Sequence, residues 1–198
     1  MGRKKLLITG FDPFGGETVN ASWEAVRQLP DQIGDYDLYK LQIPTVFGLG
    51  ASIVLEEAAK IRPDVILSVG QAGKRAVITP ELVAVNLREA RIPDNHGAQP
   101  VNKPVVPEGP AAYFSTAPVR EMVAAIREAG IQADLSLGAG AFVCNDVFYT
   151  LTHHFRDSDT LVGFIHVPVL PVQTGDSRPG MALEQILTGL AAAIHALP

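Results

Sequence analysis

The chain has 198 residues, 47% hydrophobic and 19% charged, so it is long enough and apolar enough to bury one core. A net charge of −5 and the lack of a basic stripe argue against nucleic acid as a partner. No apolar run approaches the roughly 18 residues of a membrane span, and a single cysteine excludes an internal disulfide. We therefore expect a cytoplasmic protein without a membrane partner.

Strand-like apolar runs and helical patterns alternate along the chain. The expected elements, in chain order, are a strand at 5–9, a helix at 23–29 capped by Ser22, a strand at 36–43, a helix at 49–61, strands at 65–69 and 83–86, a helix at 119–129, a strand at 133–137, a helix at 144–155, a strand at 161–167 and a helix at 181–197. This alternation predicts one domain over residues 1–198, a three-layer α/β/α sandwich with a mostly parallel central sheet.

Two connections stand out from the expected elements. Residues 91–110 hold five prolines and two glycines and predict a long functional loop. Residues 10–20 begin like a phosphate-binding loop, but Gly16 and Glu17 stand where that motif needs lysine and a hydroxyl residue. This loop instead carries Phe11 and Phe14. Their rings either wall a pocket for a small, flat, apolar group or belong to the core, and this stretch alone leaves both interpretations open.

Cys144 is the candidate nucleophile because it is the only cysteine and directly precedes a helical pattern. A helix N-terminus favours thiolate over thiol, although an inert buried cysteine is also compatible with this position. A cysteine nucleophile needs a histidine. His166 ends an apolar strand, where α/β sites gather, whereas His153 lies about 14 Å down the helix of Cys144. Glu81, among apolar residues, is either the partner of a buried group or a surface residue.

Three blocks of the chain resemble the pyroglutamyl peptidase family, also called pyrrolidone-carboxylate peptidases, a family of cysteine exopeptidases. The blocks are LITGFDPFGGETVNASWEAV, ITPELVAVNLREARIPDNHGAQP and GAFVCNDVFYTLTHHF followed by GFIHVPVLPVQ. The resemblance implies that Cys144, His166 and Glu81 are catalytic and that an N-terminal pyroglutamyl residue is removed from peptides through a thioester. It implies one catalytic domain, no metal or organic cofactor, and a homo-oligomer, commonly a tetramer.

The resemblance also implies which residues surround the pyroglutamyl ring. They are Phe11, Phe14, Gln71, Ile92 and Phe142, with Arg91 near the oxyanion. Ala21, Leu82 and Val169 depart from residues common in the family, but none of them replaces a reacting group. Two other classes remain as alternatives: an enzyme resembling a nucleoside phosphorylase, and a binding protein without catalysis.

Overall fold

The structure is a computed structural model of the chain and describes residues 2–174 and 179–198. Within these residues, six strands form the main sheet in the order β2-β3-β1-β4-β8-β5. The strands are β1 (Lys4–Phe11), β2 (Gln32–Ile33), β3 (Tyr36–Ile43), β4 (Val65–Gln71), β5 (Thr79–Pro80) and β8 (Leu161–Val167). Strands β3, β1, β4 and β8 run parallel, while the short β2 and β5 are antiparallel at the two edges.

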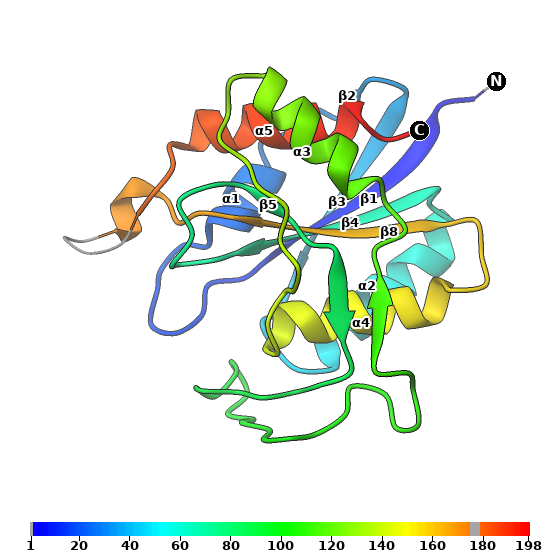
Figure 1. Cartoon of the computed structure of the whole chain (residues 1–198), viewed down its shortest axis with the longest axis vertical. Helices are drawn as coiled ribbons and strands as arrows, with labels where there is room; N and C mark the ends of the chain where they lie inside the picture. The colour runs from blue at the N-terminus through cyan, green and yellow to red at the C-terminus, as the bar shows by residue number, and fades with distance from the viewer. Residues whose placement is uncertain (1, 175–178) are drawn as a thin grey trace.

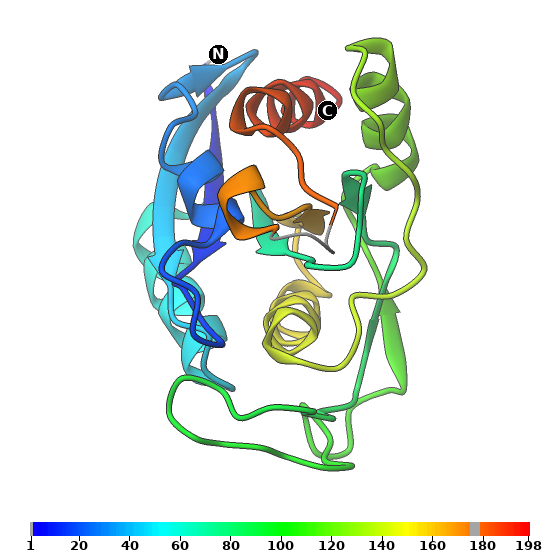
Figure 2. The same ribbon diagram turned by 90° about the vertical axis from the view of Figure 1, so that its left-hand side faces the viewer.

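Helices cover both faces of this sheet (Figures 1 and 2). They are α1 (Ala21–Val26), α2 (Leu49–Ile61), α3 (Val119–Glu128), α4 (Val143–Phe155) and α5 (Leu183–His195), with a short helix η1 (Pro171–Gln173). Alternate β1 residues feed two cores, since Leu6 packs with α1, α3 and α5 whereas Leu7 packs with α2 and α4. The predicted α/β/α sandwich is therefore confirmed. No helix in the described ranges is long and apolar enough to cross a membrane.

The parallel strands bring distant parts of the sequence to one edge of the sheet. Strand β4 pairs with β8 so that Gly70 lies opposite His166 and Gln71 opposite Val167. Strand β1 ends beside them at Phe11, and the loop after it follows the same edge. This edge is where the sequence places its unusual loops.

The predicted strand at 133–137 is wrong. This segment, which lies between α3 and α4, forms only isolated bridges, Ile78 to Ala133 and Glu81 to Ser136. A longer ladder is interrupted at Pro80, which lacks the N–H that a ladder needs. The segment nevertheless runs beside β5 and delivers the chain to the start of α4.

The strand predicted at 83–86 is present as β6 (Val83–Val85), but it lies outside the main sheet. It pairs with β7 (Ala112–Phe114), which the sequence pattern did not reveal. Asn145 on α4 holds this hairpin, because its amide oxygen accepts from Val85 N and its nitrogen donates to Val85 O. The long loop between β6 and β7 has no helix and extends from the body of the protein (Figure 1).

The first helix begins two residues earlier than predicted, at Ala21. Its cap is Asn20, whose side chain accepts from Ser22 N, and not Ser22 as expected. The Ser22 hydroxyl instead accepts from Phe11 N at 3.0 Å. That bond ties the helix to the end of β1.

Candidate active site

Cys144 is the second residue of α4, as the sequence pattern predicts. The chain enters this helix through Gly140, whose φ of +80° favours glycine. The thiol lies directly against strand β4: a Cβ atom placed on Gly70 would be 2.9 Å from the Cys144 Sγ. Only a residue without a side chain leaves room for the sulfur at this position.

His166 lies on the same side of the sheet as the thiol because it is the β8 residue opposite Gly70. Residues opposite one another in a parallel pair direct their side chains to the same face of the sheet. The face that Gly70 presents to Sγ is therefore also the face of the His166 ring. The imidazole is 4% exposed and packs against Phe164, with ring centroids 4.9 Å apart.

Glu81 orients the imidazole. Its Oε1 lies 2.7 Å from His166 Nδ1, and the carboxylate is fully buried. Burial opposes the charged form, but the hydrogen bond and charge of His166, together with Ser136 and Arg75, lower the pKa of Glu81. An ionised carboxylate only accepts hydrogen bonds, so Nδ1 carries the proton in the shared bond. The Nε2 atom is then the basic nitrogen of the ring.

Arg75 completes this group, and sequence reasoning missed it. Its Nη1 donates to the same Oε1 of Glu81 and to the Thr79 hydroxyl, and its Nη2 lies 3.3 Å from Gly138 O. Like Ser136, it lowers the pKa of Glu81. A signal was available, since a carboxylate in an apolar stretch needs a partner and the nearest preceding cations are adjacent to one another at 74 and 75.

The ionisation state of Cys144 differs from the expected thiolate. Burial, followed by the negative charge of Glu81, raises its pKa to about 12, although the charge of Arg75 acts in the opposite direction. The residue as a whole is half-buried, and its sulfur lies closely against Gly70. The start of the helix is not sufficient to ionise it, because the loss of hydration is the larger effect. The resting residue is a thiol that needs a base.

A cavity of about 510 Å³ is lined by the segment that leads into α4 as far as Phe142, two residues before Cys144. Phe14 and Phe142 lie on it with ring centroids 6.1 Å apart, and Phe47 packs edge-on against Phe142. The lining residues are Phe14, Gln71, Gly73, Leu87, Glu89, Arg91, Ile92, Ala139, Gly140, Ala141 and Phe142. Five of the residues predicted to surround a substrate are therefore brought together: Phe14, Gln71, Arg91, Ile92 and Phe142.

Phe11 is placed differently from these five. It is 2% exposed, does not line the cavity, and packs in the core with its ring 6.3 Å from that of Phe164. The cause is its position at the end of β1, where alternation directs it toward α2 and α4. Of the two phenylalanines in this loop, only Phe14 reaches the cavity.

Two aspartates hold the loops around the cavity. Asp12 Oδ1 accepts from Thr45 N at 2.7 Å and from the Asn95 side chain at 3.1 Å. Asp94, which is 6% exposed, accepts three backbone N–H groups, from residues 47, 96 and 98. These bonds join the loops at 10–20, 44–48 and 91–110, which sequence periodicity does not connect.

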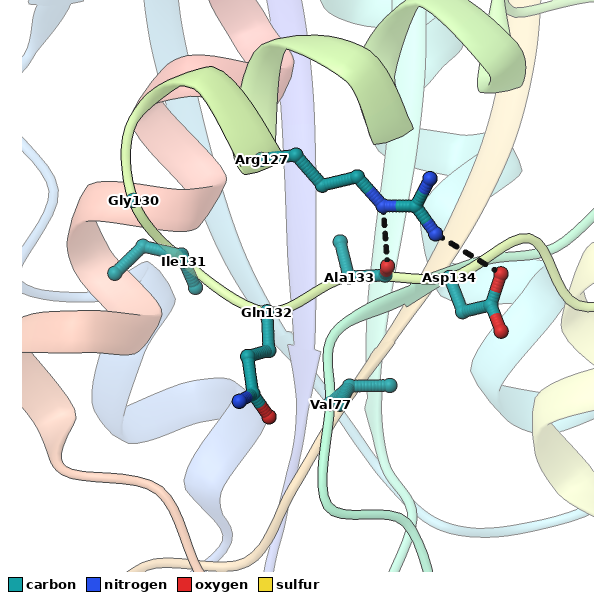
Figure 3. Close-up of a pocket in the computed structure, with 7 residues that line it drawn as sticks. All are labelled: Val77, Arg127, Gly130, Ile131, Gln132, Ala133 and Asp134. Carbon is teal, nitrogen blue, oxygen red and sulfur yellow. Dashed lines mark hydrogen bonds and ion pairs between the residues drawn. The ribbon is translucent and has the colours of Figure 1, made fainter.

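Figure 3 shows a separate cavity of about 460 Å³ at the end of α3. Arg127 crosses it, donating from Nε to Ala133 O at 2.8 Å and pairing with Asp134 at 3.3 Å. Arg127, Ala133 and Asp134 already bond to one another there, and none of the predicted site residues contributes to the lining.

Comparison with known proteins identifies the relatives of this chain. The model of the family described as pyroglutamyl peptidase matches residues 4–198. The pyrrolidone-carboxylate peptidases of Levilactobacillus brevis and Escherichia fergusonii are 49% and 50% identical, covering 98% and 96% of this chain and 97% and 91% of their own. A crystal structure of Bacillus amyloliquefaciens pyroglutamyl peptidase I, 46% identical, superposes with a TM-score of 0.94 over 98% of this chain and 96% of that one. The expected family resemblance is confirmed.

Proposed function

This chain belongs to the pyroglutamyl peptidase family, a family of thiol peptidases that remove N-terminal pyroglutamate, and we propose that Cys144, His166 and Glu81 carry out this hydrolysis. One observation carries the assignment. The thiol of Cys144 lies against Gly70, Gly70 is the β4 residue opposite His166, and Glu81 orients the His166 ring. A nucleophile, a base and a group that orients the base are the parts that acyl transfer requires.

The buried thiol decides the order of proton transfers. His166 Nε2 takes the Sγ proton as the sulfur attacks the carbonyl carbon that joins pyroglutamate to the next residue. The imidazolium that forms is stabilised by the ionised Glu81. The His166 imidazolium then gives its proton to the departing amine, and the pyroglutamyl group remains on Cys144 as a thioester. Water attacks the thioester with His166 again as base, and free pyroglutamate and the thiol are released.

The oxyanion of each step forms next to the start of α4. The first N–H groups of a helix have no acceptor within the helix, and Cys144 is the second residue. Such donors typically contribute about 3–4 kcal/mol each to the transition state. Arg91, which lines the adjoining cavity, is the proposed side-chain contributor.

The cavity beside Cys144 is proposed to hold the uncharged lactam ring of the substrate. Phe14 and Phe142 supply apolar walls, and Ile92 lies at the mouth with 40% of its surface exposed. Gln71 Oε1 already accepts from Ala21 N at 2.7 Å, so its Nε2 is the group left to donate to the lactam carbonyl. Phe11, behind Phe164, is proposed to support the His166 ring in place of the substrate contact expected from the sequence.

Hydrolysis of pyroglutamyl-aminomethylcoumarin by the purified chain tests this function. We expect fluorescent product from the wild type, none above background from Cys144→Ser, and no requirement for phosphate. Product formation that depends on phosphate would favour the phosphorylase alternative. An inactive but folded wild type would favour a binding protein.

We further propose that residues 1–198 are one catalytic domain that assembles as a homotetramer in the cytoplasm. Exposed apolar side chains support self-association, among them Phe114 on β7 with 69% of its surface exposed and Leu137 with 72%. The unpaired Cys144, which must stay reduced to react, supports a reducing compartment. Light scattering coupled to size exclusion measures the mass in solution, and a monomer would exclude the tetramer.

A further inference from the structure

We propose that Arg75 is a positioning residue of the active site, which holds Glu81 in line with His166 and ties that pair to the loop ahead of Cys144. The inference rests on the proposed function of the three catalytic residues. Arg75 belongs to the connection between β4 and β5, so it reaches the site from a different segment than any of them.

The contacts of Arg75 are those of a fixed fork. One nitrogen, Nη1, donates to Glu81 and to Thr79, and the other, Nη2, lies 3.3 Å from the Gly138 carbonyl. Because the guanidinium is planar, occupying both nitrogens sets its orientation. Gly138 stands six residues before Cys144, in the turn that leads into α4. The fork therefore spans the distance from the carboxylate to the segment that carries the nucleophile.

The carboxylate needs this partner because of where it lies. Glu81 is fully buried, and a buried carboxylate without compensation is strongly disfavoured. His166 alone is an incomplete partner, since it is uncharged whenever it is ready to accept the thiol proton. Arg75 is charged throughout the cycle, and its side chain is 29% exposed, so it remains partly hydrated. It keeps Glu81 ionised in the states in which the imidazole is neutral.

The charge of Arg75 also acts on Cys144 and on Glu81. It favours the thiolate of Cys144, which Glu81 disfavours. It also lowers the pKa of Glu81, so the carboxylate stays ionised to lower pH. The charged and titratable groups of this site are Glu81 after β5, His166 on β8, Cys144 on α4 and Arg75 itself, while Glu89 and Arg91 line the cavity nearby. Loss of the cation makes Glu81 easier to protonate and the thiolate of Cys144 harder to form, so the acidic limb of activity is expected at higher pH.

The test compares three variants with the wild type in hydrolysis of pyroglutamyl-aminomethylcoumarin from pH 5 to 9. Arg75→Met is expected to lower kcat about 10- to 100-fold with KM within about threefold, and to move the acidic limb of the kcat/KM profile to higher pH. Arg75→Lys keeps the charge but not the fork, so it is expected to leave that limb in place and lose about 3- to 10-fold in kcat. Lys74→Met removes the same charge from the exposed neighbouring residue and is expected to match the wild type.

The rate at which iodoacetamide alkylates Cys144 provides a second readout that needs no substrate. We expect Arg75→Met to slow alkylation at pH 8, while Lys74→Met leaves the rate unchanged. A folded Arg75→Met with wild-type kcat and pH profile would overturn the proposal, as would a shift of the same size in Lys74→Met. Where Arg75→Met does not fold, Arg75→Lys decides, since wild-type kcat in that variant refutes a positioning fork. An inactive wild type refutes the proposed function instead, and the alkylation rates still test Arg75.

Discussion

Gly70 on β4 lies directly against the sulfur of Cys144 on α4, although the two residues are far apart in the sequence. The sulfur occupies the space that a side chain at position 70 would need. This contact fixes the nucleophile at the level of His166, the residue opposite Gly70.

Gly70→Ala should therefore lower the rate of catalysis. The added Cβ would lie 2.9 Å from Sγ and 2.8 Å from the Phe164 ring, so the thiol must move away from its base. Misplacement of a reacting atom by about 1 Å can cost about 100-fold, and we expect kcat/KM to fall by that order. Gly163→Ala is the matched control, since its Cβ meets Ala117 at 2.8 Å away from the thiol. It should lower Tm, while the folded fraction keeps normal activity.

Alkylation of Cys144 by iodoacetamide should accelerate with pH and not level off in the neutral range. With the pKa raised to about 12 by burial, the thiolate fraction rises about tenfold for each pH unit between pH 6 and 9. One label per chain is expected in the wild type, and none in Cys144→Ser, which should fold normally and lose nearly all hydrolysis. A rate that reaches a plateau below pH 8 would mean that the resting residue is already a thiolate.

The histidines should differ sharply in their effect on acylation. His166→Ala is expected to slow it by about 10²- to 10⁴-fold, as for other general bases, and Glu81→Gln should fall between this variant and the wild type. His153→Ala should retain activity within about threefold. Its ring bonds Tyr113 at 2.8 Å and stacks on Tyr149, so its loss costs stability, about 1 kcal/mol. If His166→Ala and His153→Ala slowed acylation equally, the proposed position of the active site would be wrong.

The cavity predicts strong preference for pyroglutamyl over prolyl substrates. A prolyl amine brings a positive charge to the apolar walls of Phe14 and Phe142, and it has no ring carbonyl for Gln71. We expect kcat/KM to be at least about 10³-fold lower for the prolyl substrate. Phe14→Ala should raise KM for the pyroglutamyl substrate without preventing alkylation of Cys144. Similar rates on both substrates would contradict the proposed lactam pocket.

Asp94→Asn should destabilise the protein in a pH-dependent way. Burial opposes the charge of this carboxylate, but the N–H groups of Phe47, Ala98 and His96 outweigh that effect and lower its pKa. Its contribution is complete above the ordinary pKa of about 4 and is lost as the pH falls through the lower value of the folded state. At pH 7 we expect a loss of about 1–2 kcal/mol in the free energy of unfolding. Denaturation of both proteins at pH 7 and pH 3 should show the difference shrinking in acid, and a constant difference would contradict it.

The sequence by itself determined the architecture of the layers and singled out the candidate nucleophile. Alternation of apolar runs with helical patterns predicted the parallel sheet, because both periodicities are local properties of the chain. Cys144 needed no structure, since it is the only cysteine and its surroundings precede a helix. The same local logic failed at 133–137, where an apolar stretch forms only isolated bridges beside a strand interrupted by Pro80.

Only the tertiary structure decided the partners and the charge state of the site. Strand register sets Gly70 opposite His166, and no periodicity within either strand contains that alignment. Tertiary packing likewise pairs Arg75 with Glu81. It also places Phe11 in the core and Phe14 at the cavity. The thiol form of Cys144 follows from desolvation, which depends on all the segments that surround the sulfur. Residue type predicts which chemistry is available, whereas packing between distant segments sets its geometry and electrostatics.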